Sequence, residues 1–141
     1  MQWADWLAAA AVHPVTLIAV GSAAGGNLRY WLGRWIDEQP WAAGLPWGTF
    51  VINVTGSLLL GFLAVWFFER AGPDRRELYL LLGTGFCGGY TTFSTFEWET
   101  YKLVRDGRWE LALANVAGSV VAGFLGVLLA VAVVGLVLPK R

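Results

Sequence analysis

The chemistry that this sequence can support is most evident in the uncharged, glycine-rich stretch from Gly83 to Phe96, which carries five threonine or serine hydroxyls. A hydroxyl becomes a nucleophile only when a neighbouring base accepts its proton. The chain has one histidine, His13, one cysteine, Cys87, and no carboxylate deep in an apolar segment. We therefore expect that the protein is not an enzyme, that Cys87 is a small buried side chain, and that the hydroxyls form a polar lining.

A second group of polar side chains recurs every four residues in an earlier apolar segment. Thr49, Asn53 and Ser57 fall on one face of a helix, and Gly61 continues the line. Hydrogen bonds to neighbouring helices can account for Thr49 and Ser57. The amide of Asn53 offers two donors and an acceptor near the middle of the segment, which makes it the stronger candidate for a polar path.

Phe93 and Phe96 are three residues apart and share a helix face if a helix resumes after Gly89. An aromatic ring has a negative face and a positive edge. Ring edges along a narrow polar path attract a small anion weakly, which suits conduction because a tightly held ion does not leave. Ordinary packing of the two rings is the alternative interpretation.

The pair Gly88 and Gly89 favours an interruption of the helix between Gly88 and Thr91. Carbonyls released by an interruption inside a membrane are ligands for a small hard cation such as sodium. A glycine kink whose carbonyls are satisfied by threonine hydroxyls is the alternative interpretation.

Charged residues border the candidate path. Arg29, near the end of the first apolar segment, either extends to lipid headgroups or faces a water-filled vestibule and attracts anions. Glu97 and Glu99 follow the last phenylalanine, where we expect solvated or paired carboxylates.

The elements that position these groups belong to a membrane protein. The chain has 141 residues, of which 57% are hydrophobic and 14% charged, and its mean hydropathy is +0.56. These values indicate one all-α integral membrane domain. Ten basic and ten acidic residues give zero net charge, so we expect no binding of nucleic acid.

Four apolar segments are long enough to cross a bilayer as helices, and the third contains the interruption. They cover residues 14–33, 47–68, 78–101 and 111–138. Residues 1–13 form an N-terminal extension with no assigned role, and residues 14–141 form the transmembrane domain. The N-terminus contains Asp5 and no basic residue before its apolar run, which argues against a cleaved signal peptide.

Loop charges barely select an orientation of these helices. Five Lys or Arg residues lie on the side of the termini, and four, or five with Arg29, lie on the other side. We therefore expect insertion in both orientations and an antiparallel homodimer. A stripe of small residues can bring helices close together in that dimer or within one subunit. It consists of Ala114, Gly118, Ala122, Gly126 and Ala130.

Three local patterns occur together in this chain. Residues 26–30 read GNLRY, residues 48–56 read GTFVINVTG, and residues 83–96 read GTGFCGGYTTFSTF. Together they resemble the Fluc (CrcB) fluoride channels. The resemblance implies four transmembrane helices with a broken third helix, and an antiparallel dual-topology homodimer in the bacterial inner membrane. It also implies two fluoride pores, passive export of fluoride from the cytoplasm, and one central structural sodium ion.

The resemblance also assigns roles by motif position. Phe93 and Phe96 match the phenylalanines of the fluoride path, and Asn53 matches its asparagine. Gly88 and Thr91 match the backbone sodium ligands. Arg29 matches the vestibule arginine, and Ser119 falls where the family has a pathway serine. Thr49 and Thr92 are added to the predicted fluoride path for their hydroxyls.

The fourth segment matches the family least well. Asn115 stands where the family commonly has a tyrosine, and Gly123 where some members have a serine. The polar track is therefore expected to be relayed differently here.

Two other functions compete with the fluoride channel. A dual-topology, proton-coupled small multidrug exporter has the same general architecture, but it needs a carboxylate within a span, normally the first. The first span here has Arg29 and no acid. A structural membrane subunit without transport activity would leave the clustered hydroxyls of residues 91–95 without a purpose.

Overall fold

The computed structural model describes residues 13–70 and 75–137, and for Glu69 and Arg70 it describes only the backbone. The described residues are almost entirely helical and contain no strand, which confirms the predicted all-α class. The predicted N-terminal extension, residues 1–13, lies outside the described residues except for His13.

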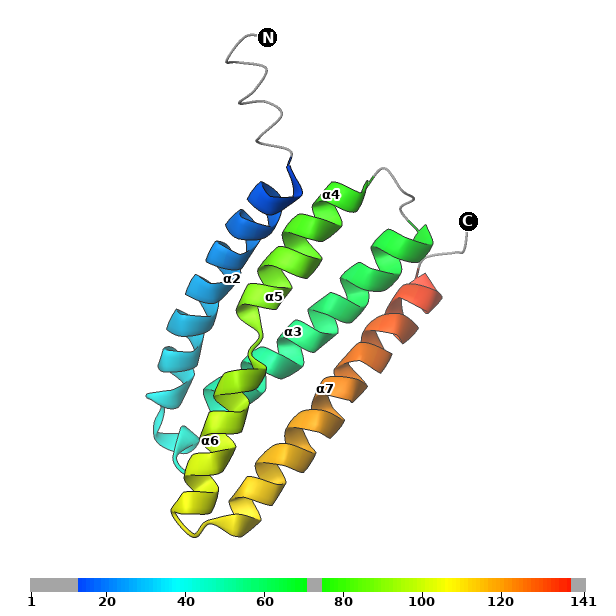
Figure 1. Ribbon diagram of the computed structural model, residues 1–141. Coiled ribbons are helices and arrows are strands. Elements are labelled where there is room, and N and C mark those ends of the chain that lie inside the picture. Colours follow the sequence, from blue (N-terminus) through cyan, green and yellow to red (C-terminus); the bar gives the residue numbers. More distant parts are fainter. Residues whose placement is uncertain (1–12, 71–74, 138–141) are drawn as a thin grey trace.

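Successive helical segments run alternately down and up one long axis (Figure 1). The first is α2 (Pro14–Asp37), and after the short 3-10 helix η1 (Pro40–Ala42) the chain returns through α3 (Trp47–Val65) and the π-helix η2 (Trp66–Arg70). The next segment is interrupted. It comprises α4 (Arg76–Tyr79), the π-helix η4 (Leu80–Cys87), α5 (Gly88–Tyr90) and α6 (Phe93–Arg105). The last is α7 (Trp109–Val137).

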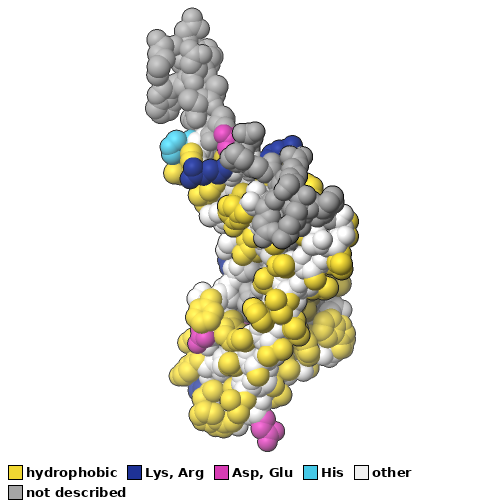
Figure 2. All heavy atoms as spheres, turned by 90° about the vertical axis from the view of Figure 1, so that its right-hand side faces the viewer, with side chains coloured by type: hydrophobic (Ala, Val, Ile, Leu, Met, Phe, Trp, Pro, Cys, Tyr) yellow, Lys and Arg dark blue, Asp and Glu magenta, His cyan; other side chains and the backbone are white. Residues whose placement is uncertain are grey.

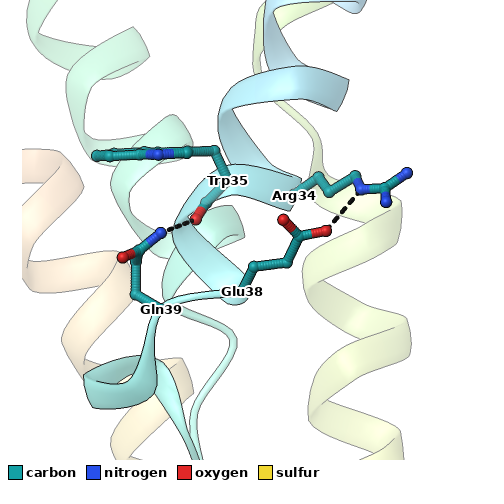
Figure 3. Close-up of polar contacts among 4 residues, drawn as sticks. All are labelled: Arg34, Trp35, Glu38 and Gln39. Carbon is teal, nitrogen blue, oxygen red and sulfur yellow. Dashed lines mark hydrogen bonds and ion pairs between the residues drawn. The ribbon is translucent and has the colours of Figure 1, made fainter.

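Helix α2 extends four residues beyond its predicted end at Gly33. Arg34 donates a hydrogen bond to Glu38 at 2.7 Å, and the side chain of Gln39 donates to the Trp35 carbonyl at 2.8 Å (Figure 3). The hydrogen bond to Glu38 raises the pKa of Arg34 above its ordinary value. These contacts hold the last turn in helical form, although its charged residues predicted a loop.

The connection to α3 is fixed by a carboxylate. Asp37 Oδ1 accepts a hydrogen bond at 2.8 Å from the N–H of Gly48, in the first turn of α3. The first N–H groups of a helix have no partner within the helix, so a carboxylate there stabilises it. Across the bundle, Arg108 donates to the Gly44 carbonyl at 2.8 Å and joins the two loops at this end.

Helix α2 packs against η4 and α5 with almost no side chains between the backbones. A Cβ atom on Gly21 would overlap the Leu81 carbonyl oxygen, and one on Gly89 would overlap the carbonyl oxygen of Ser22. The hydroxyl of Ser22 donates to the Gly85 carbonyl at 3.3 Å. These glycines therefore serve close helix approach, as small residues do at membrane helix interfaces.

The small-residue stripe of α7 packs against α3 in the same chain. A Cβ atom on Gly126 would lie 3.3 Å from the Val54 carbonyl oxygen, and one on Gly61 would lie 3.2 Å from the Ala130 side chain. Of the two interpretations of the stripe, the structure therefore supports packing within one subunit.

Two of the described helices, Trp47–Phe68 and Trp109–Val137, are long and apolar enough to cross a membrane. Only 28% and 17% of their most apolar windows are buried, which is unlike the core helices of a soluble protein. Hydrophobic side chains cover most of the face shown in Figure 2. Both helices agree closely with the predicted second and fourth segments.

Candidate functional site

The helix of the third segment breaks at Thr91 and Thr92, not at the glycine pair. Gly88 is helical, with φ −63° and ψ −36°, and helix α5 continues to Tyr90. Thr91 has ψ 159° and Thr92 has φ −152° and ψ 119°, which are extended conformations. The interruption predicted between Gly88 and Thr91 is therefore wrong for Gly88 to Tyr90, which are helical, and right for Thr91. The helix resumes at Phe93, so Phe93 and Phe96 lie on one helix as predicted. Gly89 is needed for its approach to α2, as described above.

Asn53 of α3 closes this break from the side. Its amide Nδ2 donates to the Thr92 carbonyl at 2.9 Å, and the Thr92 N–H donates to Asn53 Oδ1 at 2.8 Å. One side-chain amide thus replaces both backbone bonds that Thr92 would make to another extended strand. Asn53 was predicted as a donor along a polar path, and the structure adds this second use of its amide.

At the break, two carbonyl oxygens lose the N–H groups that would donate to them in a continuous helix. In a continuous helix the Thr92 N–H would bond the Gly88 carbonyl, but here it bonds Asn53. The Thr95 N–H would bond the Thr91 carbonyl, but it donates to Thr92 Oγ1 at 3.3 Å. Gly88 and Thr91 are the two residues that the sequence assigned to sodium. Released carbonyl oxygens fit a small hard cation, so the residues present are compatible with that group.

The Thr91 carbonyl already has one cationic neighbour. Arg29 Nη1 of α2 donates to it at 3.1 Å, and the hydroxyl of Thr91 donates to the Cys87 carbonyl at 2.9 Å. Arg29 was expected to extend to headgroups or to face a vestibule. Instead its guanidinium reaches the helix break while also lining a cavity, which is described below.

Two further residues of α3, Thr55 and Gly56, shape the break. Both belong to the GTFVINVTG pattern, but no role was predicted for either. A Cβ atom on Gly56 would overlap the methyl group of Thr91, so glycine is required for Thr91 to sit where it does. The hydroxyls of Thr55 and Tyr90 are hydrogen-bonded at 3.0 Å, and Tyr90 is buried. These contacts anchor the last turn before the break.

Beside the break lies a cavity of about 280 Å³, which we name the Phe96 cavity. The rings of Phe93 and Phe96 lie 5.8 Å apart at an angle of 43°. Phe96 is only 6% exposed, whereas Phe93 is 74% exposed in the single chain. The wall of the Phe96 cavity comprises Asn53, Gly56, Ser57, Leu60, Thr91, Thr92, Phe93, Phe96, Ser119 and Val120.

A second cavity of about 370 Å³, the Arg29 cavity, also has Thr92 in its wall. Two arginines and two carboxylates line it. The lining residues are Gly26, Arg29, Tyr30, Gly33, Arg34, Asp37, Thr49, Ile52, Thr92, Thr95 and Glu99. The residues predicted for one path therefore fall into two cavities, with Thr49 and Arg29 in this one and Thr92 in both walls.

Ser119 and Val120 complete the Phe96 cavity from α7. Ser119 Oγ is buried and has no hydrogen-bond partner among the described residues. A buried hydroxyl without a partner is unfavourable, so this oxygen is suited to a ligand or water. Gly123 faces Ser57 of α3, because a Cβ atom built on it would lie 3.5 Å from Ser57 Oγ.

Asn115, the residue that departs from the family pattern, is buried and turned towards α6. Its Nδ2 donates to Thr100 Oγ1 at 2.8 Å, and that hydroxyl donates to the Phe96 carbonyl at 2.8 Å. The amide thus supports the backbone of a cavity residue. Glu99 Oε2 is buried without a hydrogen-bond partner among the described residues, whereas Glu97 is exposed.

A family model described as CrcB-like protein, Camphor Resistance (CrcB), matches residues 16–131. The chain belongs to the CrcB family. A CrcB relative from Frankia casuarinae, named fluoride-specific ion channel FluC 1, is 46% identical over 126 residues, which are 84% of this chain and 97% of the relative. A relative from Oceanobacillus iheyensis, named fluoride-specific ion channel FluC, is 44% identical over 82% of this chain and 84% of its own length. One of the same name from Chloroflexus aurantiacus is 40% identical over 85% and 94%.

Membership of the CrcB family, together with the apolar helices, makes this chain a membrane protein. The CrcB match covers the helix break and both cavities, because it runs from the start of α2 to near the end of α7. It does not include residues 1–15 or 132–141.

Proposed function

We propose that this protein is a fluoride-selective channel that lets fluoride leave the bacterial cytoplasm passively across the inner membrane. The observation that carries the proposal is the unpartnered Ser119 hydroxyl in a cavity walled by Phe93 and Phe96. The fluoride channels named among the relatives support the choice of ion.

The Phe96 cavity has the groups that a partly dehydrated fluoride ion needs. A conducting site must replace part of the ion's water and still release the ion. The hydroxyl of Ser119 donates a strong hydrogen bond, and the ring edges of the phenylalanines attract an anion weakly. Among the residues of this wall there is no lysine, arginine or histidine that would hold the anion tightly.

The Arg29 cavity provides the entrance to this path. Arg29 and Arg34 place positive charge in its wall, and Asp37 and Glu99 place negative charge beside it. The charges of the wall balance, and Arg34 is paired with Glu38, so Arg29 is the group that would attract an anion to this entrance. Thr92 and Thr49 then offer hydroxyls to an anion on its way to the Phe96 cavity.

We further propose that two antiparallel copies associate and form two pores. Phe93 is largely exposed, and the hydroxyls of Ser94 and Thr95 are exposed near the middle of the predicted third span. Polar groups at that depth are unfavourable against lipid, so a second copy that covers them would stabilise the protein. The balanced loop charges support insertion in both orientations.

A structural sodium ion between the two copies completes the proposal. The released carbonyls of Gly88 and Thr91 would hold it. Its positive charge would balance the partial negative charges of the carbonyl oxygens that the broken helix of each copy contributes. Gly88 is exposed, and a Cβ atom built there would meet no neighbouring helix or side chain, so this part of α5 is open to a partner copy.

Purified protein in liposomes tests the channel directly. Vesicles loaded with fluoride and chloride should lose fluoride rapidly and retain chloride, measured with ion-selective electrodes and without a proton gradient. Ser119→Ala should slow fluoride efflux, whereas Gly135→Ala, on α7 but away from both cavities, should not. Efflux that requires a proton gradient would support the multidrug-exporter alternative, and no efflux at all would support a structural subunit.

A further inference from the structure

Arg29 is the only described cation with a hydrogen bond to the helix break. Its Nη1 donates to the Thr91 carbonyl at 3.1 Å. The ion pairs among the described residues join Arg34 to Glu38 and Arg105 to Asp106, so Arg29 has no carboxylate partner at ion-pair distance there. The rest of its guanidinium lines the Arg29 cavity.

The Thr91 carbonyl is also one of the two oxygens proposed for sodium. A guanidinium and a sodium ion on one carbonyl oxygen repel each other, and the repulsion is strong where water is scarce. The carbonyl cannot satisfy both cations equally well. One of them must weaken its contact when the other is bound.

We propose that Arg29 and sodium compete for the Thr91 carbonyl, so that one side chain couples the cation site to the anion entrance. This inference rests on the sodium site of the proposed function. An anion in the Arg29 cavity attracts the guanidinium and draws it away from the carbonyl. Fluoride then strengthens the binding of sodium, and by reciprocity sodium strengthens the binding of fluoride at the entrance.

The competition can be measured without ion flux. Sodium that binds only the folded protein stabilises it by RT ln(1 + [Na⁺]/Kd), so the rise of the unfolding temperature with sodium concentration gives an apparent dissociation constant. The titration uses detergent-solubilised protein with N-methylglucamine as the replacement cation, once in chloride and once in fluoride. Fluoride should lower the sodium dissociation constant of the native protein at least about fivefold, the lower end of usual coupling between sites.

Arg29→Gln should bind sodium more tightly than the native protein in chloride, and fluoride should no longer change its dissociation constant. Arg34→Gln is the matched control. Arg34 lines the same cavity, but its guanidinium bonds Glu38 rather than the break (Figure 3), so this variant should keep the effect of fluoride. If Arg29→Gln does not fold, Arg29→Lys keeps the positive charge with a more compact donor and should keep a fluoride effect.

The outcomes separate the inference from the proposed function. Sodium that fails to stabilise the native protein would overturn both the sodium site and this competition, while leaving fluoride efflux as an independent result. Sodium that stabilises the native protein and Arg29→Gln equally, with no effect of fluoride on either, would overturn the competition alone. A fluoride effect that disappears in Arg29→Gln and persists in Arg34→Gln supports it.

Discussion

Replacing Asn53 by leucine removes the clamp on the helix break while keeping a side chain of similar volume. Both hydrogen bonds between Asn53 and Thr92, at 2.9 and 2.8 Å, are lost together. Each leaves a backbone group of Thr92 without its partner, at roughly 1–3 kcal/mol per buried group. The sum is about 2–6 kcal/mol. Hydrogen bonds inside membrane proteins often contribute less, so we expect about 2 kcal/mol of lost unfolding free energy.

The assay is reversible unfolding of the purified protein in detergent, followed by tryptophan fluorescence. Ser57→Ala is the matched control, because Ser57 lies one helical turn further along α3 and lines the same cavity. Asn53→Asp keeps an acceptor for the Thr92 N–H but loses the donor to its carbonyl, so it should also be less stable than the native protein.

Fluoride efflux from the same variants distinguishes a clamp from a simple ion ligand. Asn53→Leu should lose both stability and flux. If it instead unfolds with the same free energy as Ser57→Ala and loses only flux, Asn53 acts on the ion alone and the reasoning about the break is refuted.

Four other substitutions, with Gly135→Ala as a control, test the packing and the path. Gly89→Ala should destabilise the protein by at least about 2 kcal/mol in the same unfolding assay, because a Cβ there overlaps the carbonyl of Ser22, whereas Gly135→Ala should be neutral or stabilising. Phe96→Ile should slow fluoride efflux and lower the unfolding free energy by about 1 kcal/mol, because Phe96 is buried. Phe93→Ile should slow efflux with little change in unfolding free energy, because Phe93 is exposed. Unchanged efflux in both variants would contradict the role of the ring edges. Ser119→Ala should reduce efflux about tenfold without loss of stability, since its hydroxyl has no partner to lose, and a marked fall in unfolding free energy would show that the hydroxyl serves packing instead.

Hydropathy and charge predicted the helical segments well because these signals are local. The second and fourth predicted segments agree with Trp47–Phe68 and Trp109–Val137 within about two residues. The end of α2 was placed too early, because the sequence alone did not show that the charged residues after Gly33 bond to one another. The small-residue stripe was visible, but only the packing against α3 showed which helix it meets.

The position of the break could not be predicted from local sequence. Glycine is permissive in both kinks and close helix contacts, and at Gly89 the contact with α2 is the actual requirement. The break lies where Asn53, distant in sequence, offers an amide to Thr92. The motif indicated that Asn53, Thr91 and Thr92 belong to one site. Their hydrogen-bond partners, and the reach of Arg29 to the Thr91 carbonyl, depend on how three segments meet.

A broken helix in a membrane protein usually serves as a hinge, because the missing backbone bonds let the two halves swing. Here the two extended residues are held from two directions. Arg29 of α2 holds the Thr91 carbonyl, and Asn53 of α3 holds both backbone groups of Thr92. The break is therefore mechanically a stiff joint. When Arg29 leaves the Thr91 carbonyl to sodium, the two bonds of Asn53 still hold Thr92, so the angle between α5 and α6 is expected to stay fixed while the two cations exchange.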